Sequence, residues 1–175
     1  MHMKKKFVLV IIFLVTFLAL FGQEEGRMTF ALRDQKGKVM QEFTLALING
    51  KQLYDSVFVR YYSNGKKKDS CYYEKGFIVG NACTYDKKGR ITSISEFLGK
   101  SFPREINQKT YYKTGICSYD GKVIENAEGK LEYDGIQKFY WKNGQIMDSA
   151  IYENGNKIYR ARFNANGQFE FEQKY

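Results

Sequence analysis

Carboxylates are the side chains of this sequence best suited to chemistry, and two close pairs could act as the acid and base of a glycosidase. Glu170 and Glu172 alternate near the C-terminus, and Asp69 and Glu74 lie on one short segment. Glycoside hydrolysis uses two carboxyl groups that flank the scissile bond. Alternating acids are also typical of the solvated face of a strand, and no segment gathers an acid pair, a nucleophile and an oxyanion donor. We therefore expect a protein without enzymatic activity.

The sequence contains no histidine after the N-terminal segment. The only histidine is His2. Removal of the first 22 residues would leave neither an imidazole general base nor an imidazole metal ligand. We expect no catalytic residue, no metal site and no cofactor.

Residues 1–22 are typical of a secretory signal peptide. Lys4, Lys5 and Lys6 precede an apolar run from Phe7 to Phe21, which Thr16 alone interrupts and which small Gly22 follows. This run is shorter than the roughly 20 residues of a membrane span. The sequence predicts export to the periplasm or medium, with an uncleaved inner-membrane anchor as the alternative and no other membrane contact.

The net charge is moderately basic. The full chain carries +9, and loss of the three signal lysines lowers this to +6. The lysines are dispersed apart from Lys66, Lys67 and Lys68, which favours a solvated surface over a nucleic-acid stripe. We expect no nucleic-acid partner.

Cys71, Cys83 and Cys117 allow at most one disulfide and leave one thiol over. The hairpin interpretation below puts Cys71 and Cys83 on neighbouring strands, so they are the predicted pair. Three buried free thiols are the alternative.

Short aromatic and aliphatic runs separated by turn dipeptides predict β structure. Five Asn-Gly pairs and Asp120-Gly121 lie between these runs, and each is a hairpin signal because Asn and Gly tolerate positive φ. The Asn-Gly pairs begin at Asn49, Asn64, Asn143, Asn154 and Asn166.

The hairpins form a repeat of about 23 residues. A shift of 79 residues lays Tyr61, Asn64-Gly65, Asp69-Ser70 and Tyr73-Glu74 on Tyr140, Asn143-Gly144, Asp148-Ser149 and Tyr152-Glu153. A fixed period of this length is typical of repeat proteins in which each unit packs on its neighbours. Recurrence of the Asp-Ser pair predicts side-chain to backbone bonds at a strand end.

This unit resembles the bacterial variant of the MORN repeat, over residues 53–171. The segments SISEFLGKSFPRE and ENAEGKLE depart from that pattern and look like longer connections. The resemblance implies an all-β, extended and twisted antiparallel sheet of repeated hairpins, formed by residues 53–175, with residues 23–52 as an atypical capping segment. The family includes exported proteins of unknown role and some antitoxin or immunity components, which implies binding rather than chemistry.

The last hairpin allows its register to be predicted. A three-residue loop, Ala165 to Gly167, with Gly167 left-handed, places Phe163 opposite Phe169 and Arg162 opposite Glu170. A two-residue turn would instead set Phe163 against a charge, and a slip of one residue turns every side chain to the wrong face.

The predicted contact surface is a ladder of aromatic rings with neighbouring lysines: Tyr62, Tyr112, Trp141, Lys66, Lys113 and Lys142. Tyrosine and tryptophan give a large contact area at low entropic cost, which suits binding of another protein. The rings could equally shield the sheet by packing across strands. A carbohydrate-binding or weakly carbohydrate-active module is the alternative function, and contact with a lipid surface is the second. The open edges of such a sheet also predict a homodimer through an edge strand.

Overall fold

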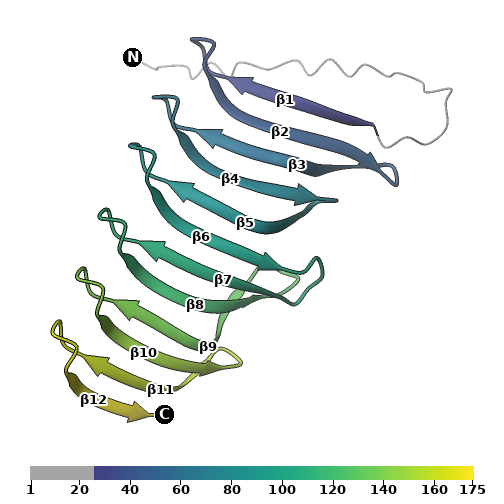
Figure 1. Ribbon diagram of the computed structural model, residues 1–175. Coiled ribbons are helices and arrows are strands. Elements are labelled where there is room, and N and C mark those ends of the chain that lie inside the picture. The colour runs from purple at the N-terminus through teal and green to yellow at the C-terminus, as the bar shows by residue number, and fades with distance from the viewer. Residues whose placement is uncertain (1–25) are drawn as a thin grey trace, which may run out of the picture.

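The computed structural model describes residues 26–175, which form one open antiparallel sheet of twelve strands in sequence order (Figure 1). The predicted signal peptide, residues 1–22, lies outside this range, as do residues 23–25. The all-β hairpin architecture predicted from the sequence is confirmed. The strands are β1 (Arg27–Arg33), β2 (Val39–Ile48), β3 (Lys51–Tyr61), β4 (Lys67–Glu74), β5 (Phe77–Tyr85), β6 (Ile91–Leu98), β7 (Arg104–Tyr111), β8 (Cys117–Glu125), β9 (Leu131–Tyr140), β10 (Ile146–Glu153), β11 (Asn156–Phe163) and β12 (Phe169–Lys174).

Six turns of one kind lie along one long edge of the sheet, on the left of Figure 1, and we call this the turn edge. Each turn has five residues, and the N–H of the first donates to the carbonyl of the fifth. The fourth residue is a glycine with φ between +78° and +87°, and its N–H donates to the carbonyl of the first. Glycine adopts this left-handed conformation readily because it has no Cβ. The turns are residues 34–38, 62–66, 86–90, 112–116, 141–145 and 164–168.

The last of these turns confirms the predicted three-residue loop, with Gly167 left-handed and Phe163 paired with Phe169. The predicted register of Arg162 was wrong, because it lies opposite Phe171 rather than Glu170, but its Nε still forms an ion pair with Glu170 (3.5 Å). Each of the six turns is followed by one extra residue that bulges out of the ladder, and Glu170 is that residue here.

The opposite edge of the sheet has five connections of unlike length. Three are two-residue turns in which both residues have positive φ: Asn49-Gly50, Lys75-Gly76 and Asn154-Gly155. The other two span residues 99–103 and 126–130, and the second of these has the same backbone hydrogen bonds as the six turns of the turn edge. Asp120-Gly121 was wrongly predicted as a turn and lies inside β8. Gly121 is required there because a Cβ would lie 2.0 Å from Oε1 of the fully buried Gln137.

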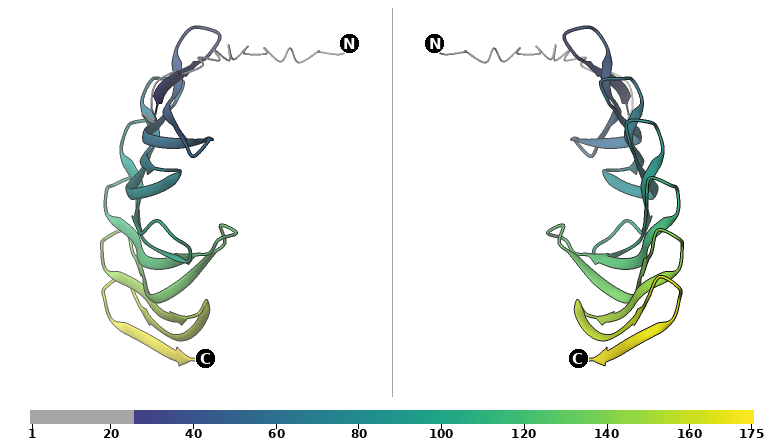
Figure 2. Two further views of the ribbon diagram at one scale, coloured as in Figure 1. Left: turned by 90° about the vertical axis from the view of Figure 1, so that its right-hand side faces the viewer. Right: turned by 90° about the vertical axis from the view of Figure 1, so that its left-hand side faces the viewer.

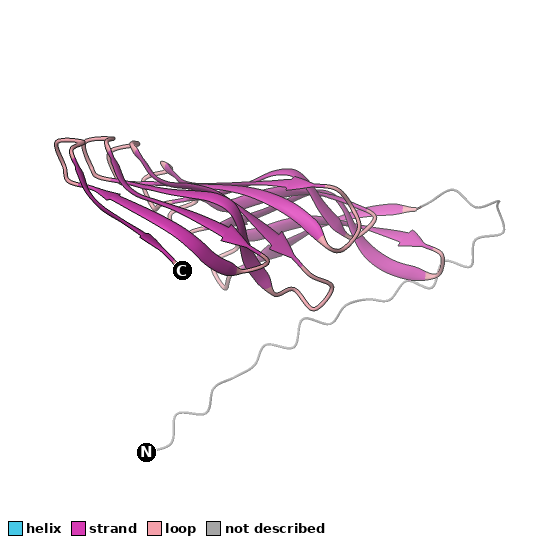
Figure 3. Ribbon diagram, turned by 90° about the horizontal axis from the view of Figure 1, so that it is seen from below, coloured by secondary structure: helices cyan, strands magenta, loops and turns pink. Residues whose placement is uncertain are grey.

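Strand register sorts the side chains onto two faces. We call one the aromatic face, because it carries Phe30, Phe43, Phe58, Tyr73, Phe97, Tyr119, Tyr133, Phe139 and Tyr152. Extra residues in β3, β5 and β9 bend these strands, and Figures 2 and 3 show the resulting curved, twisted sheet. Ile106 and Val123 pair on the aromatic face and are almost fully buried. Curvature therefore supplies a core to a sheet that has a single layer.

The N-terminal segment belongs to the same sheet. Residues 27–52, within the expected capping segment, form β1, β2 and the start of β3, and the 34–38 turn has the hydrogen bonds of the other five. The boundary expected at residue 52 falls inside β3. Similarly, the segments expected to be long connections contain most of β6, the start of β7, the last residue of β8 and the start of β9.

The predicted disulfide does not form. All three cysteines are free. Cys83 pairs with Ser70, so Cys71, the next residue along β4, points to the other face of the sheet. Neighbouring strands alone were too weak a criterion, because a bridge also needs both thiols on one face.

The repeated aspartates also differ from the sequence expectation. Asp69 accepts a hydrogen bond from Nε of Arg60 (2.8 Å), and Asp148 accepts one from Nε of Arg160 (2.8 Å). These aspartates therefore hold adjacent strands together through arginine and not through nearby backbone.

Candidate functional site

The six predicted contact residues all lie on the turn edge. Tyr62, Tyr112 and Trp141 occupy the first position of their turns, while Lys113 and Lys142 occupy the second. Lys66 occupies the fifth position of the 62–66 turn. Because these turns all lie at the same end of their hairpins, residues that are far apart in sequence form a single row.

The three rings are half-buried, and each fastens its turn to the next hairpin. The Tyr62 hydroxyl donates to the carbonyl of Tyr85 (2.8 Å), and the Tyr112 hydroxyl donates to that of Tyr140 (2.6 Å). Nε1 of Trp141 donates to the carbonyl of Phe163 (3.1 Å). Each acceptor is the residue directly before the next turn. The polar ends of these rings therefore make structural contacts, which sequence reasoning missed.

Other side chains extend this pattern to every neighbouring pair of turns. Nδ2 of Asn64 donates to the carbonyl of Lys87 (2.8 Å), and Nδ2 of Asn143 donates to that of Ala165 (2.6 Å). Arg90 donates to Lys113 (3.0 Å), and Lys38 donates to Ser63 (3.1 Å). In all four bonds the acceptor is the second residue of the next turn. The recurrence of Asn at the third position was the sequence signal that could have revealed this contact.

Local hydrogen bonds engage the two acids of the turn edge. Oδ1 of Asp34 accepts from the N–H groups of Lys36 and Lys38. The Asp86 carboxylate accepts from the Arg90 side chain, which lowers the pKa of Asp86 below its usual range. Neither acid neutralises a lysine side chain of the row.

The turn edge is strongly basic as a result. The six turns hold eight basic residues against two acidic ones, a net charge of +6, whereas the full chain carries +9. Six of the lysines are exposed, and within residues 26–175 their ammonium groups make no hydrogen bond or ion pair: Lys36, Lys66, Lys87, Lys88, Lys113 and Lys142.

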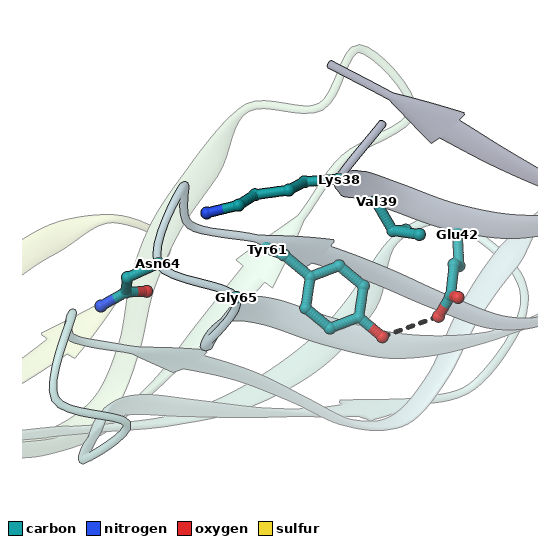
Figure 4. A pocket seen from close by; sticks show the side chains of 6 residues that line it. All are labelled: Lys38, Val39, Glu42, Tyr61, Asn64 and Gly65. Atoms are coloured by element: carbon teal, nitrogen blue, oxygen red, sulfur yellow. Dashed lines mark hydrogen bonds between the residues drawn. The ribbon is translucent and has the colours of Figure 1, made fainter. Parts of the chain in front are cut away.

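Two shallow hollows lie between neighbouring turns. One, of about 420 Å³, lies between the first and second turns, with Lys38 and Asn64 on its rim (Figure 4). In it the Tyr61 hydroxyl donates to Oε2 of Glu42 (2.6 Å), and this bond raises the pKa of Tyr61. A second hollow, of about 520 Å³, lies between the third and fourth turns and is flanked by Arg90 and Lys113. Both could receive side chains of a partner beside a positive charge.

The carboxylate pairs considered for glycoside hydrolysis are each bound to other groups. Asp69 pairs with Arg60 and Glu74 with Lys100, while Glu172 accepts from the Tyr159 hydroxyl. Nor do residues 26–175 contain a cluster of three or more His, Cys, Asp or Glu residues that could hold a metal ion. In the same range, no helix is long and apolar enough to cross a membrane.

Comparison with known proteins adds only distant structural likeness. The sequence matches no protein-family profile and no curated protein. The crystal structure of a protein of unknown function from Bacteroides fragilis is similar at 9% sequence identity, over 86% of this chain and 93% of that chain, with a TM-score of 0.20. A TM-score this low supports no conclusion about fold or function. The resemblance to MORN repeats thus stays an expectation from the sequence.

Proposed function

We propose that this chain is a non-enzymatic, exported binding protein whose turn edge recognises an acidic surface of another protein. The proposal rests on the row of six exposed lysines whose ammonium groups have no partner among residues 26–175. Charge complementarity of this kind guides association and selects among partners. Export remains an expectation from residues 1–22.

The hydrogen bonds between turns favour recognition because they hold the row in one geometry. Every neighbouring pair of turns is joined by a bond from a side chain to a carbonyl group. Binding then costs less backbone ordering than it would for free loops. In this proposal the lysines make the contact, while Tyr62, Tyr112 and Trp141 hold the turns in position and present only their exposed portions.

Two triple variants with the same change in net charge test the proposal. The first replaces Lys66, Lys113 and Lys142 with Gln. The second replaces three lysines away from the turns, Lys51, Lys138 and Lys174, with Gln. Binding to a synthetic Glu-rich peptide is measured by titration calorimetry, followed by capture from an envelope extract.

We expect the turn-edge variant to lose about tenfold or more in affinity, because exposed ion pairs contribute roughly 0.2–1 kcal/mol each. The control variant should bind like the wild type. Equal loss in both variants would show a general charge effect and overturn the assignment of the surface. Stronger binding to anionic vesicles or to a sulfated glycan than to the peptide would overturn the choice of a protein partner.

Carbohydrate binding is a second candidate, because part of the aromatic face is exposed. Tyr54 is 37% exposed and packs 5.0 Å from Tyr73, while Tyr133 is 41% exposed and packs 5.0 Å from Tyr152. Flat exposed rings can stack on sugars. Loss of neutral oligosaccharide binding in Tyr54→Ala or Tyr133→Ala, with binding kept by the lysine variants, would favour this function.

A further inference from the structure

The two outermost strands of the described sheet, β1 and β12, each pair with a single neighbour. The bond from Leu47 N–H to the Gly26 carbonyl shows that even-numbered residues of β1 direct their backbone groups toward β2. The bond from Tyr175 N–H to the Ile158 carbonyl shows the same for odd-numbered residues near the end of β12. Ala31 of β1 and Glu172 of β12 therefore direct their backbone groups outward.

All five junctions between successive hairpins share one register. The third residue after a turn lies opposite the second residue before the next turn. The pairs are Gln41 with Arg60, Asp69 with Thr84, Ser93 with Thr110, Tyr119 with Phe139, and Asp148 with Arg162. A further hairpin added to either end would extend the sheet by the same rule.

Applied to β12 and to β1 of a second copy, this register places Phe171 opposite Leu32. The pairing also sets Tyr175 opposite Met28, again on the aromatic face. These four side chains are between 42% and 61% exposed in the single chain. The same register brings Glu170 next to Arg33 and aligns the outward backbone groups of Glu172 and Ala31. Apolar side chains, opposite charges and hydrogen-bonding groups all match at once.

The turn edge supplies an independent sign of the same contact. Asn64 and Asn143, at the third position of their turns, donate to the second carbonyl of the following turn. Asn166 holds the third position of the last turn, and within residues 26–175 its side chain makes no hydrogen bond. In a second copy placed by the shared register, the matching acceptor is the carbonyl of Gln35.

We propose that the protein assembles head to tail, with β12 of one copy pairing antiparallel with β1 of the next. Such a contact joins two different edge strands, so each copy can bind another at both ends. The assembly therefore grows as an open chain instead of closing as a dimer. Pairing of two β12 strands would place the two turn edges on opposite sides and leave Asn166 without its acceptor. The inference does not depend on the ligand proposed for the turn edge.

Two proline variants test the assembly, because proline removes an outward N–H and is tolerated in edge strands. Ala31→Pro blocks the head and Glu172→Pro blocks the tail, while Ala31→Thr retains the N–H as a control. Sedimentation velocity follows mass against protein concentration, and circular dichroism checks that each variant is folded. Asn166→Ala is a milder variant, since its side chain makes no bond within the described chain.

We expect the average mass of the wild type and of Ala31→Thr to rise beyond a dimer with concentration. Each proline variant alone should remain a monomer, and an equal mixture should stop at one copy of each, because only one intact interface can form. Asn166→Ala should weaken association about fivefold, the loss of one net hydrogen bond. A wild type that stays monomeric, a wild type that stops at dimers, or proline variants that assemble normally would each overturn the proposal.

Discussion

The turn edge and the opposite edge connect the same twelve strands, but their connections follow different patterns. Six turns on the turn edge share one length and one set of hydrogen bonds. The five opposite connections have two lengths, and only residues 126–130 among them show the same hydrogen bonds. The turn edge also carries side-chain bonds from every turn to the next. The turn edge therefore sets the strand register, while the connections of the opposite edge can vary in length.

Charge divides between the edges in the same way. The five opposite connections contain Lys75, Lys100 and Lys130 against Glu128, and the lysines at 100 and 130 are paired with acids. The turn edge instead holds six lysines that have no partner in the described part of the chain. The regular edge is therefore also the edge that presents an uncompensated charge to solvent.

Insertion of one residue should give the largest difference between the edges. A glycine inserted between Asn143 and Gly144 disrupts the turn bonds or shifts the register, at an expected cost of about 3 kcal/mol. A glycine inserted between Lys100 and Ser101 lengthens an irregular connection and should cost less than about 1 kcal/mol. Urea unfolding measures both values. Equal losses would mean that the turn edge does not set the register.

Replacement of Asp55 should show how much its side chain stabilises the Lys75-Gly76 turn on the opposite edge. Oδ1 of this buried carboxylate accepts from the N–H of Lys75 (3.0 Å), beside the bond from Gly76 N–H to the Tyr54 carbonyl (2.8 Å). The Lys75 bond is the main cause that lowers the Asp55 pKa, although burial opposes it and Arg27 adds to it. Asp55→Asn should cost about 2 kcal/mol at neutral pH, since hydrogen bonds to charged groups contribute roughly 1.5–3 kcal/mol.

The same carboxylate should make stability depend on acid. A lowered folded-state pKa favours the ionised form, so its contribution is present above the unfolded pKa of about 3.9 and is lost as pH falls through the lower folded value. Asp55→Asn should therefore flatten the dependence of unfolding free energy on pH in this acidic range. A variant with the same acid dependence as the wild type would contradict this role.

Removal of single hydroxyls should have a smaller effect at the turn edge. Tyr62→Phe and Tyr112→Phe each delete one bond to the next hairpin and should cost about 1 kcal/mol. Tyr72→Phe is the matched control, because Tyr72 is 48% exposed and its hydroxyl has no hydrogen bond within the described residues. If all three variants unfold at the same urea concentration as the wild type, the rings do not fasten the turns.

A reducing agent should have no effect on unfolding. Cys71 and Cys83 point to opposite faces, and burial raises the pKa of Cys71 to about 11, which disfavours its reactive thiolate. Mass spectrometry after alkylation of the unfolded protein should find three free thiols. A drop in the unfolding midpoint with reductant would reveal a bridge that this fold does not accommodate.

Local signals in the sequence were enough to predict the hairpins. Asn-Gly pairs and short aromatic runs predicted a meander of antiparallel strands, and the alternation around Phe163 and Phe169 predicted the loop at Gly167. The same signal failed at Gly121, which lies inside a strand. There glycine is needed because a Cβ would clash with the buried side chain of Gln137. A turn dipeptide indicates only that the backbone can adopt positive φ. Packing against a side chain of another strand can require a glycine for a different reason.

The candidate site was only partly predictable. Sequence patterns grouped Tyr62, Tyr112 and Trp141 in one ladder on a face of the sheet, whereas they lie in turns along one edge. Their acceptors belong to the next hairpin, whose offset depends on the register between hairpins. The bulge at Glu170 was missed for a related reason, since an extra residue changes which residues pair without disturbing the local alternation of residue types.

Hydrogen-deuterium exchange of the protein with and without the Glu-rich peptide tests whether the turn edge is the binding surface, because it compares the two edges in one experiment. We expect the peptide to slow exchange in the turns at 62–66, 112–116 and 141–145, with no change at 49–50, 75–76 and 154–155. Slowed exchange at the opposite edge or over the aromatic face alone would contradict a binding surface on the turn edge.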